Sequence, residues 1–214
     1  MKRDGVWEVD SLVTPTWTFA EAINAALAEA LEEDESVVIG GQLIRYGVAG
    51  LTTGLYDRFK DRFITYSVSE SLMNSSAMGL ALAGKRVVMI HVRMDFLACG
   101  MDALVNHIPV WAKKGTNLPI VFVCQVGKGM GQGPQHSKNL TAWFERFDGW
   151  TVGVPETPLQ AYDTLKSAIF GHKPVMFVIH RELFDTPEGK KIKTPNVVRL
   201  CGTSQRHERE FYGQ

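Results

Sequence analysis

The stretch from residue 63 to residue 96 constrains the fold of this chain more than any other. It reads FITYSVSESLMNSSAMGLALAGKRVVMIHVRMDF. The pattern predicts a strand, an acidic turn, a helix and a second strand that ends at an Asp-Phe pair. Between Asn74 and Gly84 nearly every residue is small, although a glycine inside a helix costs about 1 kcal/mol. A chain retains such a helix where another backbone must come very close to it.

The same alternation of strands and helices continues along most of the 214 residues. It predicts an α/β fold, a mostly parallel sheet of about six strands with helices on both faces. We assign residues 1–16 to an N-terminal arm, 17–186 to a single domain and 187–214 to a C-terminal tail. Further strands are predicted at 36–41, 119–125, 151–154 and 174–180, and further helices at 18–33, 54–59, 97–113, 140–147 and 157–170.

Local signals define several of these helices. Thr18 and Glu21 have the spacing of a capping box. Thr157 followed by Pro158 is typical of a helix start, because proline suits the first helical position. The helix at 97–113 is predicted to place four residues on one face: Leu104, His107, Ile108 and Trp111.

Composition excludes several classes of partner. The chain has 23 basic and 23 acidic residues, and nucleic acids or anionic membranes require a basic excess. No apolar run approaches the roughly 20 residues that span a bilayer. The N-terminus MKRDGVWEVDS lacks the hydrophobic core of a secretory signal, which predicts a cytoplasmic protein. The three cysteines have neither disulfide nor zinc spacing, and we predict no metal ligands on this chain.

Glu70 is the first candidate for a functional residue. It follows a predicted strand, opens the small-residue helix and has no basic residue within several positions. One interpretation is a solvated acid at the start of a helix, which the helix dipole favours. The alternative is a functional acid at the carboxyl end of a strand, where open α/β sheets bind their ligands.

Two more candidates follow strands. His136 lies in GPQHS, after a loop at 127–134 with a glycine at every second position up to 133. Glycine-rich loops often bind phosphate, but this loop matches neither nucleotide fingerprint. His136 is therefore either a functional group at the sheet edge or an exposed loop histidine. Asp95 and Phe96 follow another strand, where an aromatic ring can serve as a stacking platform.

Taken together, these segments resemble a known family. TFAEAINAALAEAL, YGVAGLTTGLYDRF, RFITYSVSES, MDFLACGMDALVNH, GQGPQHSKNLTAWF, TVGVPETPLQAYDTLKSAI and PVMFVIHRELF follow one another in order. They are similar to the pyrimidine-binding domain of transketolase-like thiamine diphosphate enzymes, above all to the beta subunit of 2-oxo acid dehydrogenase decarboxylase components. The resemblance covers roughly residues 17–186.

The resemblance implies a role for each candidate. Glu70 matches the glutamate that hydrogen-bonds the aminopyrimidine ring of thiamine diphosphate and promotes its imino tautomer, which deprotonates the thiazolium carbon. Phe96 matches the aromatic residue that stacks on the pyrimidine, and we count Asp95 beside it among the cofactor-binding residues. His136 matches the active-site histidine that contacts substrate or intermediate. The small-residue helix matches one that packs across the subunit interface.

Departures from the family matter as well. Gly40, Gly41 and Gln42 stand where many beta subunits carry an acidic pair. The family's GDG…N motif for magnesium and diphosphate is absent, and the chain stops at Gln214 without the family's C-terminal domain. We therefore expect a diphosphate-binding alpha-type partner that holds the magnesium, in an α2β2 heterotetramer.

The reaction class stays open at this point. The substrate would be a 2-oxo acid or a ketose, and the transferred fragment a two-carbon or acyl group. Oxidative decarboxylation would feed a lipoyl protein, whereas transketolase-like or carboligase transfer would not. The alternative function is a non-catalytic scaffold or regulatory subunit that keeps the fold and the dimer surface.

Overall fold

The computed structural model describes residues 17–127 and 133–184, which form a six-stranded sheet in the order β2-β1-β3-β4-β6-β5. Every neighbouring pair of strands is parallel, which confirms the predicted α/β fold. The strands are β1 (Val37–Gly41), β2 (Phe63–Thr65), β3 (Arg86–His91), β4 (Ile120–Val126), β5 (Thr151–Gly153) and β6 (Val175–His180). The α-helices are α1 (Phe19–Glu33), α2 (Leu55–Arg58), α3 (Glu70–Leu82), α4 (Ile108–Lys113), α5 (Thr141–Phe144) and α6 (Pro158–Phe170).

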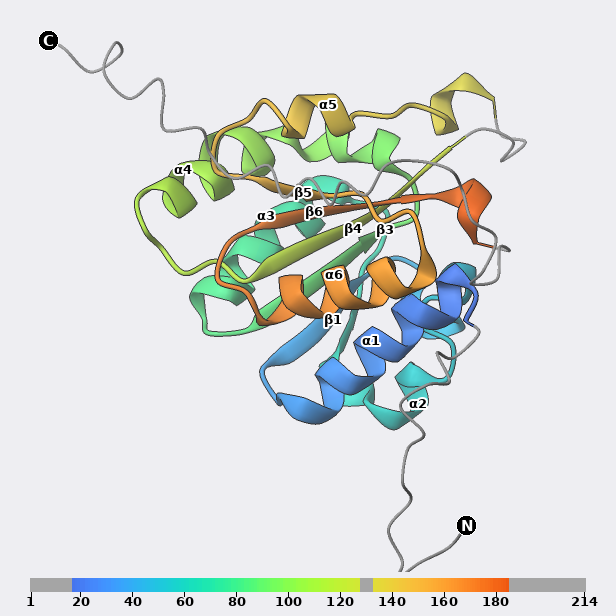
Figure 1. Ribbon diagram of the computed structural model, residues 1–214. Helices are drawn as coiled ribbons and strands as arrows, with labels where there is room; N and C mark the ends of the chain where they lie inside the picture. The colour runs from blue at the N-terminus through green and yellow to red at the C-terminus, as the bar shows by residue number, and fades with distance from the viewer. Residues whose placement is uncertain (1–16, 128–132, 185–214) are drawn as a thin grey trace, which may run out of the picture.

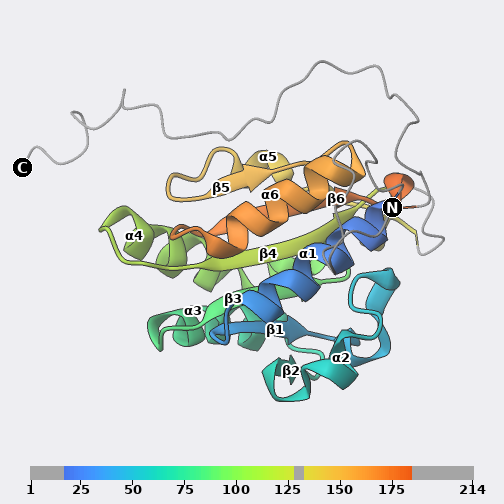
Figure 2. The same ribbon diagram turned by 60° about the horizontal axis from the view of Figure 1, so that its bottom comes forward.

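Helices cover the sheet on both sides (Figure 1). Strands β1 and β4 are buried along their whole length, as expected of strands that pack against helices on both faces. On one face α1 and α6 lie side by side across the sheet (Figure 2). The other face is covered by α3, α4 and α5 and by two irregular helical segments, the 3-10 helix η4 (Met94–Gly100) and the π-helix η5 (Ala103–His107).

Each face has its own apolar core. Side chains of alternating strand positions point to opposite faces, so Val121 and Val123 pack toward α1 and α6, while Phe122 and Cys124 pack toward α3. The first core draws its apolar residues from both helices, five strands and the segments after β1, and Thr52 and Gln125 are buried beside it. The second core includes Met73 from α3 and lies beside three of the buried polar side chains, Asn74, His91 and Asp95.

Two of the predicted helix starts are confirmed. Thr18 and Glu21 form the capping box of α1: the Thr18 backbone N–H donates to Glu21 Oε2 at 2.7 Å, and the Glu21 N–H donates to Thr18 Oγ1 at 3.3 Å. Thr157 caps α6 by accepting from the Gln160 N–H at 3.2 Å, with Pro158 as the first helical residue. The starting residues of both helices on this face are therefore set by local contacts, which can be read from the sequence.

Residues 97–113 are helical, as predicted, but they do not form one regular α-helix. The structure has η4 up to Gly100, η5 at 103–107 and α4 from Ile108, so the expected single face does not form. Leu104 and Ile108 are buried, but His107 is exposed and Trp111 is 45% exposed. Pro109 explains the change from π-helix to α-helix at this point, because it has no N–H to donate to the preceding turn and its ring crowds that turn.

The small-residue helix α3 has an outer face that nothing in the described chain covers. Ala77 and Ala81 are buried against the sheet, whereas Ser75 and Gly79 face outward. A Cβ added to Gly79 would meet no atom within 4 Å. The small outer residues therefore have no packing role among the described residues, and contact with a second subunit stays a prediction. No helix in the described part of the chain is long and apolar enough to cross a membrane.

Candidate functional site

A pocket of about 200 Å³ opens at the carboxyl ends of the central strands. The three residues that the sequence singled out, Glu70, Phe96 and His136, all line it. They come from α3, η4 and the 3-10 turn η6 (Pro134–His136). The pocket also has seven lining residues that sequence reasoning did not assign to the site: Gln42, Leu43, Met73, Ile90, His91, Val92 and Arg93.

Glu70 is the first residue of α3 and is partly buried. Its Oε1 accepts a hydrogen bond from Gln42 Nε2 at 3.2 Å. Gln42 comes directly after β1 and also reaches Met73 Sδ at 3.6 Å. Gln42 is a site residue that the sequence prediction misses. A polar residue directly after a buried strand is the signal that could have found it, because the carboxyl ends of parallel strands meet at one sheet edge.

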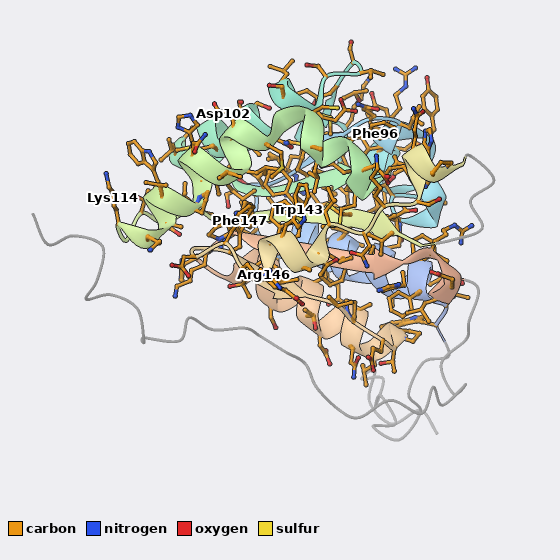
Figure 3. All side chains as sticks on the ribbon, turned by 90° about the horizontal axis from the view of Figure 1, so that it is seen from above. Phe96, Asp102, Lys114, Trp143, Arg146 and Phe147 are labelled. Atoms are coloured by element: carbon orange, nitrogen blue, oxygen red, sulfur yellow. The ribbon has the colours of Figure 1, made fainter. Side chains whose placement is uncertain are left out.

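Phe96 and His136 form the aromatic part of the pocket. Their ring centroids are 5.2 Å apart at an interplanar angle of 77°, an edge-to-face contact. Figure 3 shows Phe96 at the end of the molecule where the 134–136 turn lies. His136 is half-buried against Phe96 and is therefore not a fully exposed loop histidine. Most of the glycine-rich loop, residues 128–132, lies outside the described residues.

Asp95 is not among the residues that line the described pocket. It is only 7% exposed, and its Oδ1 accepts from the backbone N–H of Lys138 at 2.9 Å. This bond ties the segment after His136 to η4, which carries Phe96. The geometry gives Asp95 a part in holding the aromatic pair together, and a direct contact with a cofactor stays a prediction.

Two basic side chains complete the pocket. Burial lowers the pKa of His91 to about 3, so its imidazole is neutral at physiological pH. Burial also lowers the pKa of Arg93, while the charge of Asp95 acts in the opposite direction. Arg93 stays protonated, since arginine is charged at all ordinary pH values. The pocket therefore combines the Glu70 carboxyl group, one guanidinium, two imidazoles and an aromatic ring.

The remaining strand and helix histidines lie away from this pocket. His107 is exposed, with Nε2 3.2 Å from Asp102 Oδ2, and His180 has Nδ1 4.0 Å from Glu182 Oε2. Within residues 17–127 and 133–184 no group of three or more His, Cys, Asp or Glu side chains is placed to hold a metal ion.

Fold and pocket together define an α/β domain with a pocket at the carboxyl ends of its parallel strands. The family model for the pyrimidine-binding domain of transketolase matches residues 16–186. The chain belongs to this family.

Relatives and solved structures agree with this assignment. The chain is 30% identical over 187 residues to the beta subunit of acetoin:2,6-dichlorophenolindophenol oxidoreductase from Cupriavidus necator, covering 78% of this chain and 55% of that protein. It is 32% identical over 177 residues to the mitochondrial pyruvate dehydrogenase E1 beta subunit of Saccharomyces cerevisiae, covering 80% and 48%. The chain thus spans about half the length of the curated relatives it matches.

Among solved structures, a split-gene transketolase described as an inactive beta4 tetramer superposes with a TM-score of 0.65 at 20% identity. The match covers 77% of this chain and 51% of that one. Transketolase from Leishmania mexicana gives a TM-score of 0.65 at 18% identity, over 79% and 26% of the two chains. At these identities the likeness supports the fold.

Proposed function

We propose that this chain supplies the pyrimidine site of a split thiamine diphosphate-dependent enzyme. The observation that carries the proposal is that Glu70, Phe96 and His136, far apart in the sequence, line one pocket at the sheet edge. The names of the relatives, beta subunits of pyruvate dehydrogenase and of acetoin oxidoreductase, support the same function.

The pocket residues fit an aminopyrimidine ring. A volume of about 200 Å³ suits one aromatic ring, and Phe96 offers a flat apolar surface on which such a ring can stack. Glu70 offers a carboxyl group to a ring nitrogen. When bound, thiamine diphosphate supplies a nucleophilic carbon that attacks a carbonyl group and then accepts the electrons released when the neighbouring bond breaks.

The chain's own residues would handle the protons. Gln42 donates to Oε1 of Glu70 and so fixes the carboxyl group at the start of α3. Glu70 would give a proton to the ring nitrogen and take it back, which requires a group shielded from bulk water. His136, which also lines the pocket and packs edge-to-face on Phe96, would exchange a proton with the substrate.

The partner in this proposal is a diphosphate-binding alpha-type subunit, which would hold the magnesium ion in an α2β2 assembly. The substrate is a 2-oxo acid or a ketose, and the acyl or two-carbon fragment passes to an acceptor such as a lipoyl protein. A non-catalytic scaffold is less well supported, because a scaffold has no need to bring an acid, an aromatic ring and a histidine into one pocket.

Calorimetric titration with thiamine diphosphate and Mg²⁺ tests the proposal. We expect negligible heat with this chain alone and micromolar affinity after the chain is co-purified with its alpha-type partner. Micromolar, magnesium-dependent binding to the isolated chain would contradict the need for a partner. A complex that binds no cofactor would favour the scaffold.

A further inference from the structure

A buried network of polar groups lies beside the pocket. Asn74 follows Glu70 by one turn of α3 and is 0% exposed. Its Nδ2 donates to the carbonyl oxygen of Gly100 at 3.2 Å, and its Oδ1 lies 2.9 Å from Nε2 of His91. His91, at the end of β3, is 3% exposed. The network therefore joins three segments, α3, β3 and η4, and each of them contributes residues to the pocket.

The direction of each hydrogen bond follows from the chemistry of the groups. A backbone carbonyl can only accept, so the amide nitrogen of Asn74 must face Gly100 and its oxygen must face His91. His91 is neutral, because burial lowers its pKa to about 3. Its one ring proton must therefore be on Nε2, which leaves Nδ1 unprotonated. The imidazole also stacks on Phe122, with ring centroids 5.9 Å apart.

The backbone comes unusually close at the same junction. A Cβ added to Gly100 would lie 2.6 Å from Asn74 Nδ2, 2.9 Å from Ser71 Cα and 3.0 Å from the carbonyl oxygen of Glu70. Only glycine leaves room for this contact. The end of η4 thus rests on the first turn of α3, and the two segments carry Phe96 and Glu70.

We propose that Asn74 and His91 are positioning residues, which set the distance between Glu70 and Phe96 that a pyrimidine ring requires. The inference rests on the proposed function and extends it. Apolar side chains could fill the same volume, but hydrogen bonds with fixed donors and acceptors also select one arrangement of the three segments. Gln42 holds the Glu70 side chain itself, whereas the network holds the backbone from which that side chain projects.

The protonation of His91 gives a first test that needs no cofactor. In the full chain labelled with ¹⁵N, long-range ¹H–¹⁵N spectra distinguish the two neutral tautomers and the charged form. We expect the His91 signal, assigned by its loss in His91→Phe, to show the proton on Nε2 throughout pH 5 to 8. A proton on Nδ1, or a histidine that becomes charged within this range, would overturn the network.

The second test measures the affinity of the reconstituted complex for thiamine diphosphate. His91→Phe keeps the stacking on Phe122 and removes one hydrogen bond, whereas Asn74→Leu keeps the volume and removes two, those to His91 and Gly100. His91→Phe should weaken cofactor affinity about tenfold, the usual worth of one buried hydrogen bond, and Asn74→Leu by at least as much. The double variant should be no weaker than the weaker single one, because the two residues act as a unit. His91→Gln, which can still donate to Asn74, should recover most of the affinity.

Val152→Ala is the matched control, because Val152 lies in the same core but on β5, outside the pocket. It should lower stability in urea without changing cofactor affinity. If the folded variants of Asn74 and His91 also keep wild-type affinity, the network is core packing and the positioning role is wrong. If the wild-type complex binds no cofactor, the proposed function fails, and the positioning role fails with it.

Discussion

The two faces of the sheet are built in different ways. The face of α1 and α6 consists of two regular helices of 15 and 13 residues, each with a side-chain cap. Lys166 joins them by ion pairs of 2.7 Å to both Glu29 and Glu33. On the other face, 3-10, π and short α segments replace the second long helix.

The irregular face contributes to the pocket. It holds Asn74, His91 and Asp95 in buried positions, and its segments α3 and η4 place Glu70 and Phe96 in the pocket. Glu70 and Asn74 come from α3, which is a regular helix of 13 residues like α6. The difference lies beside it: the 3-10 segment η4 brings the backbone of Gly100 against the first turn of α3, and the Gly100 carbonyl accepts from Asn74. The pocket and the buried polar network therefore adjoin the face on which helix geometry is irregular.

The largest expected effect is a loss of proton exchange that distinguishes Glu70 from Glu21, two acids in the first turns of their helices. Glu70→Gln keeps the shape of the side chain but cannot pass a proton, so proton–deuteron exchange at the cofactor's reactive carbon should slow by about 10⁴-fold, the upper range for a positioned acid or base. Glu21→Gln, on the opposite face, is the matched control and should leave exchange unchanged. NMR of the reconstituted enzyme measures both. Equal rates for Glu70→Gln and wild type would remove Glu70 from the mechanism.

The next effect concerns stability alone. Leu165 in α6 is fully buried between the helices and the sheet. Leu165→Ala should lower the free energy of unfolding by about 2–5 kcal/mol, because it removes apolar contacts and leaves a cavity. Urea denaturation of the full chain measures this loss. Exchange at the reactive carbon should not change in the folded fraction, and a matching fall in exchange would show that the two faces are coupled.

The smallest expected effect is the loss of turnover caused by His136→Ala. His136→Ala removes a partly buried ring that packs edge-to-face on Phe96, so stability and cofactor affinity should change little. Turnover of the reconstituted enzyme should fall by about 10²-fold, the lower range for a general acid or base. His172→Ala, at an exposed histidine beside Asn117, is the control. Unchanged steady-state turnover for His136→Ala would return His136 to the interpretation of a loop residue without function.

The sequence predicts much of the fold and the main side chains of the pocket. The strands and the capped helices carry local signals, and Glu70, Phe96 and His136 each follow a strand whose carboxyl end must meet the others at one edge. Contacts across the fold carry no such signal. Gln42 and Glu70 are 28 residues apart, and His91 and Asn74 are 17 apart, so both pairs depend on how α3 is rotated against the sheet.

The two outermost strands, β2 and β5, are only three residues long, and each pairs with one neighbour. An edge strand exposes unpaired backbone N–H and C=O groups, to which a strand of another chain can form hydrogen bonds. A short edge strand exposes few of these groups. The sheet is therefore a poor template for the addition of foreign strands, which is the common route to aggregation. Among the described residues, the surfaces that a second subunit could pack against are therefore formed mainly by side chains rather than by open strand edges.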